Sequence, residues 1–338
     1  MKVVFLGSGP FAIPVLERLH AAGKDAQLVR VVSRPDRPAR RGRALTPTPV
    51  RARAQELDVR CDVPETANDP SYLEELAVLA ADLFIVADYG EMLRKRLRDL
   101  PRLGVFNLHA SILPRYRGAA PVAHALLQGA TETGVTLFRI VKELDAGPVV
   151  DIATTPVAPL ETTGELEGRL ALLAADLLGR NLPAFQSGLF RETPQDDTKA
   201  TLAPKLEKGS GLISWESPAA DVANRVRAFN PWPGAYSFLG GERTIFLRAR
   251  AVPSSEKDLK PGAVEAVEKD SFRVRCGAGS VEVLELQREG KAPLPAASYL
   301  RGKALRCGDV WISSPELGGP EIRASRGEGT PNLGGSGP

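Results

Sequence analysis

The chain has 338 residues, of which 43% are hydrophobic and 25% are charged, and its formal net charge at pH 7 is +3. This composition is that of a folded globular protein and excludes a wholly disordered chain, while the length favours two domains. The three cysteines, Cys61, Cys276 and Cys307, are widely spaced, which argues against a disulfide framework or a structural zinc site.

The first half of the chain alternates short apolar runs with segments of helical periodicity. Buried strands are expected at residues 3–6, 27–32, 83–87 and 104–109, and helices at residues 11–19, 73–79 and 119–127. This alternation predicts an α/β fold with a doubly wound, mostly parallel sheet and right-handed crossovers. In such a sheet ligands bind beyond the carboxyl ends of the strands.

A glycine-rich turn, Gly7-Ser-Gly9-Pro-Phe-Ala12, follows the first expected strand. It matches a relaxed dinucleotide fingerprint and supplies a competing hypothesis, a nicotinamide oxidoreductase. An NAD site needs an acidic residue near the end of the second strand, where this chain has Ser33 and Arg34. An NADP-binding oxidoreductase therefore stays open. The glycines alone are weak support, because tight strand-to-helix turns need glycine anyway.

Arginines crowd the region after the second strand, with Asp36 nearly the only acidic residue among them. They are Arg30, Arg34, Arg37, Arg40, Arg41, Arg43, Arg51 and Arg53. Such a cluster is usually a solvated face. Guanidinium groups beside proline and glycine nevertheless suit a loop that meets phosphates.

The strand at residues 104–109 carries Asn107 and His109. Side chains at i and i+2 of a strand share a face, so both can point into one site. A further strand is expected at residues 134–141, with Asp145 in the loop after it. If the two strands are neighbours, the three side chains converge at one end of a sheet.

These three side chains suit acyl transfer to an amine. A carboxamide can donate to an oxygen on which negative charge develops. An imidazole can polarise the same carbonyl or move a proton near neutral pH. A carboxylate can fix the tautomer of the imidazole and take part in removing a proton from the amine. No nucleophilic serine or cysteine is needed if the amine itself attacks.

The second half of the chain has a different pattern. Residues 163–189 predict a helix that closes the first domain, and residues 190–207 predict a linker rich in Asp, Thr and Pro. A helix at residues 219–229 is followed by short strands at residues 244–252, 262–267, 271–275 and 281–286, which indicates a small OB-like barrel. We expect a catalytic domain at 1–189, a barrel at 208–312 and a disordered tail at 313–338.

The stretch Asn107-Leu-His109-Ala-Ser-Ile-Leu-Pro-Arg-Tyr-Arg-Gly, with Asp145-Ala-Gly147 downstream, resembles the formyltransferases that use 10-formyltetrahydrofolate. Their sites carry Asn-x-His-x-Ser-Leu-Leu-Pro-x-x-Arg-Gly and a later Asp-x-Gly. The resemblance implies that Asn107, His109 and Asp145 are catalytic and that 10-formyltetrahydrofolate is the formyl donor, with no metal. It implies folate contacts from Ser111, Ile112, Leu113 and Pro114 and from Ala87, Asp88, Tyr89 and Gly90. Asp88 and Glu143 depart from the residues most common in that family.

Three further features are similar to one branch of that family, the methionyl-tRNA formyltransferases. These are the arginine-bearing loop at residues 34–43, the segment Arg227-Ala-Phe-Asn-Pro-Trp-Pro-Gly234, and the C-terminal barrel. They imply initiator methionyl-tRNA as the acceptor, with tRNA contacts from Arg40, Arg41 and Arg43 and from the barrel. The resemblance covers about residues 1–312.

Two other hypotheses stay open. An amino-sugar formyltransferase of the same fold would keep the three catalytic residues, but a sugar acceptor gives no reason for the arginine-bearing loop. A non-catalytic tRNA-binding protein would leave those three residues without a role. Because the N-terminal apolar run is too short for a secretory signal and no run can cross a bilayer, we expect a cytoplasmic protein that makes no membrane contact. We also expect a monomer.

Overall fold

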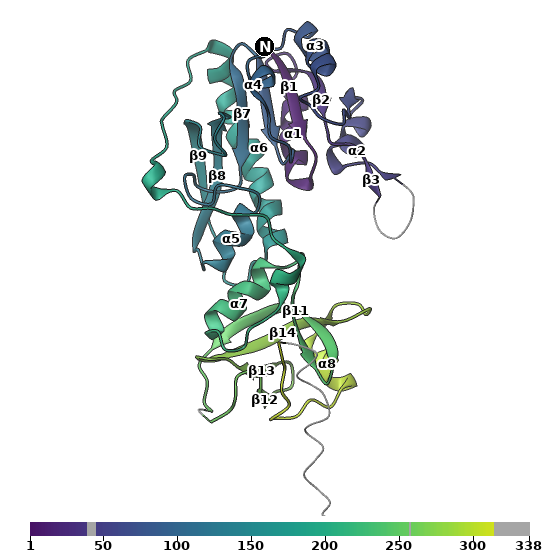
Figure 1. The fold of residues 1–338 in the computed structure, drawn as a ribbon, viewed down its shortest axis with the longest axis vertical. Helices are drawn as coiled ribbons and strands as arrows, with labels where there is room; N and C mark the ends of the chain where they lie inside the picture. The colour runs from purple at the N-terminus through teal and green to yellow at the C-terminus, as the bar shows by residue number, and fades with distance from the viewer. Residues whose placement is uncertain (39–44, 257, 314–338) are drawn as a thin grey trace, which may run out of the picture. The chain divides into compact units, whose positions relative to one another are not determined.

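The computed structural model describes residues 1–38, 45–256 and 258–313 (Figure 1). The expected tRNA contacts Arg40, Arg41 and Arg43, and the tail from residue 314 on, lie outside these residues. The chain forms two compact units, one made of Met1–Lys208 with Arg227–Pro233 and one made of Gly209–Val226 with the chain from Gly234 on.

A seven-stranded sheet in the order β5-β2-β1-β6-β7-β8-β9 forms the centre of the N-terminal unit. In chain order the strands are β1 (Lys2–Gly7), β2 (Gln27–Val32), β5 (Cys61–Asp62), β6 (Leu83–Ala87), β7 (Gly104–His109), β8 (Glu132–Arg139) and β9 (Val149–Pro156). The first five run parallel, whereas β8 is antiparallel to β7 and β9 is antiparallel to β8. The predicted doubly wound, mostly parallel sheet is confirmed.

Helices surround this sheet, and a short hairpin of β3 (Arg37–Pro38) and β4 (Leu45–Thr46) stands beside it. The helical segments are η1 (Pro10–Ala12), α1 (Ile13–Ala21), α2 (Pro49–Glu56), α3 (Pro70–Val78), α4 (Lys95–Arg98), α5 (Pro121–Leu127), α6 (Thr163–Ser187) and η2 (Asp197–Lys199). Helix α2 lies outside the helices predicted from the sequence, because only Val50 and Ala54 of its residues are buried and it shows little apolar periodicity. Its start was nevertheless marked by Thr48 as N-cap and by Pro49.

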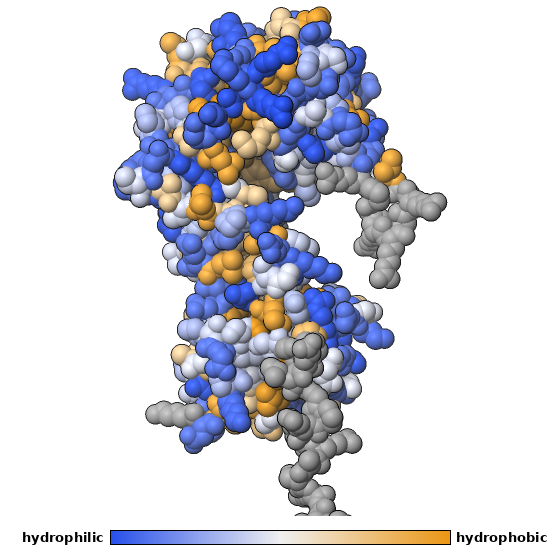
Figure 2. Space-filling model, in the orientation of Figure 1, coloured by the Kyte–Doolittle hydropathy of each residue, from blue (hydrophilic) through white to orange (hydrophobic). Residues whose placement is uncertain are grey.

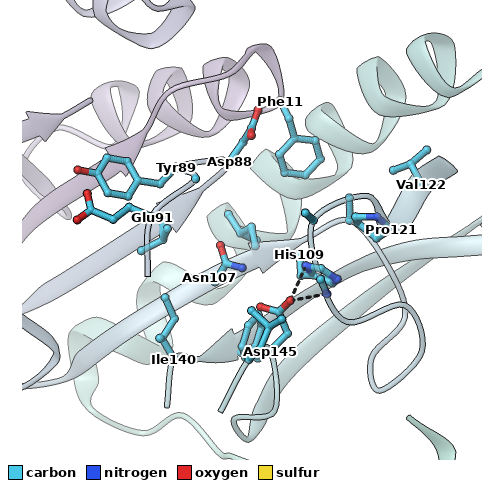
Figure 3. Close-up of a pocket in the computed structure, with 18 of the residues that line it drawn as sticks. Phe11, Asp88, Tyr89, Glu91, Asn107, His109, Pro121, Val122, Ile140 and Asp145 are labelled. Carbon is cyan, nitrogen blue, oxygen red and sulfur yellow. Dashed lines mark hydrogen bonds and ion pairs between the residues drawn. The ribbon is translucent and has the colours of Figure 1, made fainter. Parts of the chain in front are cut away.

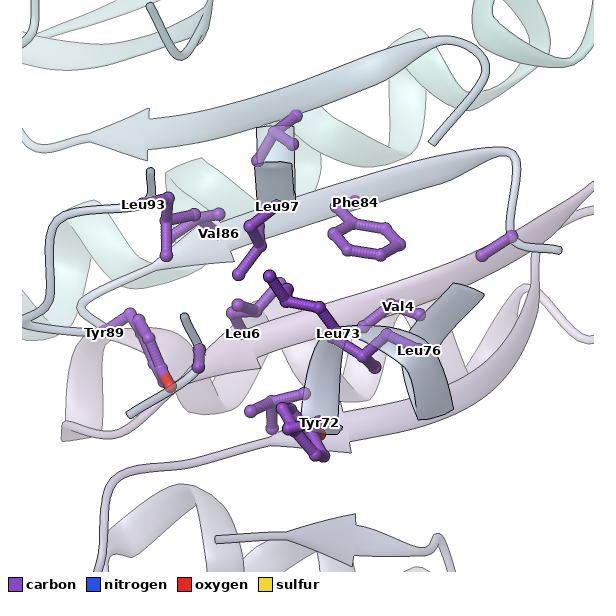
Figure 4. Close-up of a cluster of buried hydrophobic side chains, with 14 residues drawn as sticks. Val4, Leu6, Tyr72, Leu73, Leu76, Phe84, Val86, Tyr89, Leu93 and Leu97 are labelled. Atoms are coloured by element: carbon purple, nitrogen blue, oxygen red, sulfur yellow. The ribbon is translucent and has the colours of Figure 1, made fainter. Parts of the chain in front are cut away.

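Apolar side chains cover both faces of the sheet. Val4 and Leu6 of β1 pack with α3 and α4 in one core cluster (Figure 4). Val3 and Phe5 point to the opposite face and are also fully buried. Burial on both faces explains why the strands read as continuous apolar runs rather than as an alternating pattern.

The C-terminal unit contains an antiparallel sheet in the order β10-β11-β14-β13-β12, with β15 beside β14. Its strands and last helix are β10 (Ala235–Leu239), β11 (Glu242–Val252), β12 (Val264–Val267), β13 (Phe272–Arg275), β14 (Ser280–Arg288), β15 (Leu294–Pro295) and α8 (Ala296–Gly302). Most of η3 (Lys208–Gly211) and α7 (Ala219–Ala228) also belongs to it, since the unit includes Gly209–Val226. The segment at 310–312 bridges to Phe238 of β10 and to Ala263, just before β12. It thus joins the two edges of the sheet, consistent with the predicted small barrel. Strand β10 lies outside the strands predicted from the sequence.

Hydrophilic side chains cover most of the visible face of each unit, and apolar side chains show there in small groups (Figure 2). This distribution is ordinary for a folded chain whose large apolar residues are buried. Among the described residues, no helix combines the length and the apolar character needed to span a membrane.

Candidate active site

A cavity of about 750 Å³ opens at the carboxyl ends of β1, β6 and β7 (Figure 3). Its wall comes from six stretches of chain within residues 10–11, 86–93, 107–110, 118–122, 138–145 and 164–171. This is the place where a doubly wound sheet binds its ligands. The cavity is also the size of an ordinary small-molecule site.

Asn107, His109 and Asp145 all line this cavity. Asn107 is fixed by strand pairing on both sides, opposite Val86 of β6 and Phe138 of β8. The i and i+2 positions of β7 place Asn107 and His109 on the same wall. The Asp145 Oδ2 atom lies 3.8 Å from Nδ1 of His109. The three residues that the sequence pattern singled out are therefore neighbours in space (Figure 3).

Asp145 follows β8, but the end of that strand does not lead directly into the site. Because β8 is antiparallel to β7, the end of β8 lies beside the start of β7 and away from His109. The loop 140–148 folds back from there, and Gly147 passes so close to Arg139 that a Cβ would stand 1.8 Å from the Arg139 oxygen. The backbone N–H of Gly118 then donates to Asp145 Oδ2 at 2.8 Å.

The His109 ring is held by a backbone carbonyl. Only 6% of His109 is exposed, and its Nε2 lies 2.8 Å from the Tyr116 carbonyl oxygen. A carbonyl can only accept, so Nε2 carries a proton and Nδ1 faces Asp145. The separation of 3.8 Å between Nδ1 and the carboxylate is longer than a hydrogen bond. The sequence pattern predicts that the Asp145 carboxylate orients the ring. In the structure the Tyr116 carbonyl oxygen orients it instead.

The expected folate-binding residues divide into two groups. Residues 88–90 line the cavity, while Ala87 is fully buried in β6 behind them. Residues 111–114 are not among the lining residues. The Ser111 hydroxyl donates to the Arg115 carbonyl at 2.7 Å, and the Thr136 hydroxyl bridges the Ser111 carbonyl and the Leu113 N–H. This stretch shapes the loop that follows His109.

Two carboxyl groups give one part of the cavity an acidic character. Asp88 is exposed to the cavity, but the protein atoms around it displace part of its water and raise the pKa of its carboxyl to about 6. The same desolvation, together with the Asp88 charge, raises the pKa of Glu167 to about 6. Such a wall favours a cation or a hydrogen-bond donor. No motif pointed to Glu167, which lies in α6, far along the chain from Asn107, His109 and Asp145.

The glycine-rich turn after β1 is not free to bind a dinucleotide. The N–H groups of Ser8 and Gly9 donate to the Asp88 carbonyl at 3.0 and 3.2 Å. The Asp88 carboxylate also occupies the space beside Gly9, where a Cβ would stand 1.8 Å from Oδ2. A pyrophosphate would need those N–H groups and would meet that negative charge. Within the described ranges, no group of three or more His, Cys, Asp and Glu side chains is placed to hold a metal ion.

The chain matches the formyl transferase family over residues 1–182 and the C-terminal domain of formyl transferases over residues 205–304. It is 40% identical to a methionyl-tRNA formyltransferase of Roseiflexus sp. (strain RS-1) over 97% of this chain and 98% of that protein. It is 39% identical to the methionyl-tRNA formyltransferase of Moorella thermoacetica over 92% of this chain and 99% of that protein. The chain belongs to the methionyl-tRNA formyltransferase family.

Solved structures of other formyltransferases share the fold of this methionyl-tRNA formyltransferase family member. An N-formyltransferase from Helicobacter canadensis has a TM-score of 0.62 at 16% identity, covering 85% of this chain and 99% of its own. A sugar 3N-formyl transferase has a TM-score of 0.61 at 14% identity, covering 86% and 99%. At these identities the likeness concerns the fold alone.

Proposed function

We propose that this enzyme transfers the formyl group of 10-formyltetrahydrofolate to the free amino group of methionine on initiator methionyl-tRNA. The observation that carries the proposal is the convergence of Asn107, His109 and Asp145 in one cavity. Near full-length relatives that carry the name methionyl-tRNA formyltransferase support the choice of acceptor.

The amine nitrogen attacks the formyl carbon, and the carbonyl oxygen becomes an oxyanion as the new C–N bond forms. The Asn107 carboxamide donates a hydrogen bond to that oxygen. His109 has its Nε2 committed to Tyr116, so only Nδ1 faces the reaction, and in its protonated form it donates to the same oxygen. Donors that are fixed before charge develops stabilise the transition state most.

The attacking nitrogen then loses a proton, which Asp145 accepts directly or through a water molecule. The Gly118 N–H holds one oxygen of this carboxylate and leaves the other for the proton. The bond between the formyl carbon and the folate N10 breaks, and Asp145 passes the proton that it took from the amine to N10, directly or through a water molecule.

We further propose a division of labour along the chain. Residues 1–189 form the catalytic domain, residues 190–207 connect it to the barrel, and residues 208–312 bind tRNA. Residues 88–90 contact the pterin, and residues 111–114 act by shaping the adjoining loop. Arg40, Arg41 and Arg43 contact the tRNA acceptor end. We expect a cytoplasmic monomer.

Formyl transfer from 10-formyltetrahydrofolate tests the proposal, with initiator methionyl-tRNA, elongator methionyl-tRNA and a nucleotide-linked amino sugar as parallel acceptors. We expect transfer to the initiator tRNA alone. Transfer to the sugar alone would reassign the acceptor while keeping the chemistry. Absence of transfer to all three acceptors would overturn the proposal. The oxidoreductase alternative predicts NADP binding instead. The Asp88 side chain beside Gly9 and the hydrogen bonds of the Ser8 and Gly9 N–H groups to the Asp88 carbonyl argue against it.

A further inference from the structure

The segment that follows α6, residues 190–204, lies against the loops that carry the candidate catalytic residues, and we call it the strap. Thr193 exchanges two backbone hydrogen bonds of 2.8 Å with the first residue of β9. The Arg117 N–H donates to the Thr201 carbonyl at 2.8 Å, and the Ala203 N–H donates to the Arg117 carbonyl at 2.7 Å. The strap is therefore tied down on both sides of the site.

One side chain of the strap joins the two catalytic loops. Gln195 Nε2 donates to the carbonyl oxygens of Asp145 and Gly147, each at 2.8 Å. Gln195 Oε1 accepts from Nη2 and Nε of Arg117, at 2.7 and 3.2 Å. Arg117 precedes Gly118, whose N–H holds the Asp145 carboxylate. The Gln195 carboxamide thus binds both the loop that carries Asp145 and the residue before Gly118, whose N–H orients the Asp145 carboxylate.

A second side chain of the strap supports His109. The Thr201 hydroxyl accepts from the Tyr116 N–H at 2.9 Å, and the Tyr116 carbonyl holds the His109 ring. Tyr116 and Asp145 have φ angles of +62° and +49°. Non-glycine residues keep such backbone conformations only where the surroundings hold them. The strap supplies those surroundings at both residues.

We propose that Gln195 is a positioning residue for the transfer reaction, which sets Asp145 relative to His109 without touching either substrate. This inference rests on the proposed function. The role needs a carboxamide, because it donates to two carbonyl oxygens on one side and accepts from a guanidinium on the other. A carboxylate of the same shape keeps the acceptor and loses the donor.

Gln195→Glu therefore removes the donor and adds a negative charge beside Arg117, and Gln195→Met removes both functions at similar volume. We expect Gln195→Glu to lower kcat by about tenfold to a hundredfold, because a misplacement of about 1 Å has an effect of that size. The KM for each substrate should stay within about threefold. Hydrogen–deuterium exchange should be faster in peptides that cover residues 116–118 and 140–148, measured without substrate.

Gln186→Glu is the matched control, since it makes the same change at an exposed position in the last turn of α6. It should leave kcat and exchange unchanged. A kcat within twofold of wild type for both Gln195 variants, or unchanged exchange in the two loops, would overturn the inference. If the wild-type enzyme transferred no formyl group to methionyl-tRNA, the proposed function would fail, and the exchange data would still decide whether Gln195 holds the loops.

Discussion

Asn107 sits in the middle of three paired strands, so its backbone position does not depend on its side chain. His109 and Asp145 differ in this respect. The orientation of His109 depends on a carbonyl seven residues further along the chain, and that of Asp145 on the N–H of Gly118 and the carboxamide of Gln195. At the scale of residues, the orientations of the His109 and Asp145 side chains are set mostly by hydrogen bonds to backbone groups.

Removing the Asn107 carboxamide should reduce turnover while the fold persists. We expect Asn107→Ala to lower kcat by about a hundredfold to a thousandfold, because one lost oxyanion donor typically costs about 2.7–4 kcal/mol of barrier. Steady-state formyl transfer to initiator methionyl-tRNA measures the effect, with thermal unfolding as the control for folding. Turnover within threefold of wild type would remove Asn107 from the mechanism.

At the scale of elements, the antiparallel pair β8–β9 carries the loop that returns Asp145 to the site. The strands approach closely at Gly134, where a Cβ would stand 2.2 Å from the Ala153 carbonyl oxygen. A rigid backbone atom lies there, so the clash cannot be relieved by moving a side chain. The close approach of β8 and β9 at this point therefore requires glycine.

Gly134→Ala should destabilise the N-terminal unit by about 1–3 kcal/mol, the usual cost of overpacking. The opposite result is expected for Gly168→Ala in α6, where nothing lies within 4 Å of the added Cβ and alanine favours a helix by about 0.5–1 kcal/mol. Thermal unfolding of both variants against wild type makes the comparison. Equal stabilities of the two variants would contradict the packing argument.

The C-terminal unit contains a buried carboxylate that ties the β11–β12 connection to β14. Glu265 is 7% exposed. Burial by itself raises the pKa of this carboxyl, but hydrogen bonds from Ser280, Ser255 and Ser254 outweigh it and lower the pKa to about 2. The unfolded chain has the ordinary value of 4.5. Because the pKa of Glu265 is lower in the folded protein than in the unfolded chain, its ionised carboxylate stabilises the fold at pH values above about 4.5.

This stabilisation should be lost as the pH falls from about 4.5 to about 2, and it amounts to roughly 3 kcal/mol. We expect Glu265→Gln to unfold at lower denaturant concentration than wild type at pH 7, and the difference to shrink towards pH 2. Denaturant unfolding monitored by tryptophan fluorescence follows Trp215 and Trp311 in the same unit. A difference that stays constant with pH would refute the assignment.

At the scale of the whole molecule, the net charge of +3 hides an uneven distribution, with arginines concentrated after β2. If this region and the barrel bind tRNA phosphates, binding releases counterions and depends on salt. We expect the KM for initiator methionyl-tRNA to rise about tenfold or more between about 50 and 200 mM salt, and less in Arg41→Ala.

The KM for the folate donor is the internal control, because this small molecule contacts few charged groups and should respond weakly to salt. Steady-state kinetics at several salt concentrations measure both constants. A KM for tRNA that does not change with salt, or an Arg41→Ala variant with the kinetics of wild type, would count against phosphate contacts from the arginine-bearing loop.

The sequence by itself determined the parts of the protein that depend on local pattern. Continuous apolar runs located β1 and β6, because strands covered on both faces have no polar side. The i and i+2 spacing placed Asn107 and His109 on one wall. Only the tertiary structure decided the return of Asp145 past the antiparallel β8, the carbonyl of Tyr116, the carboxyl of Glu167 and the bonds of Gln195. Those features depend on hydrogen bonds and contacts between residues far apart in the chain, which local periodicity does not encode.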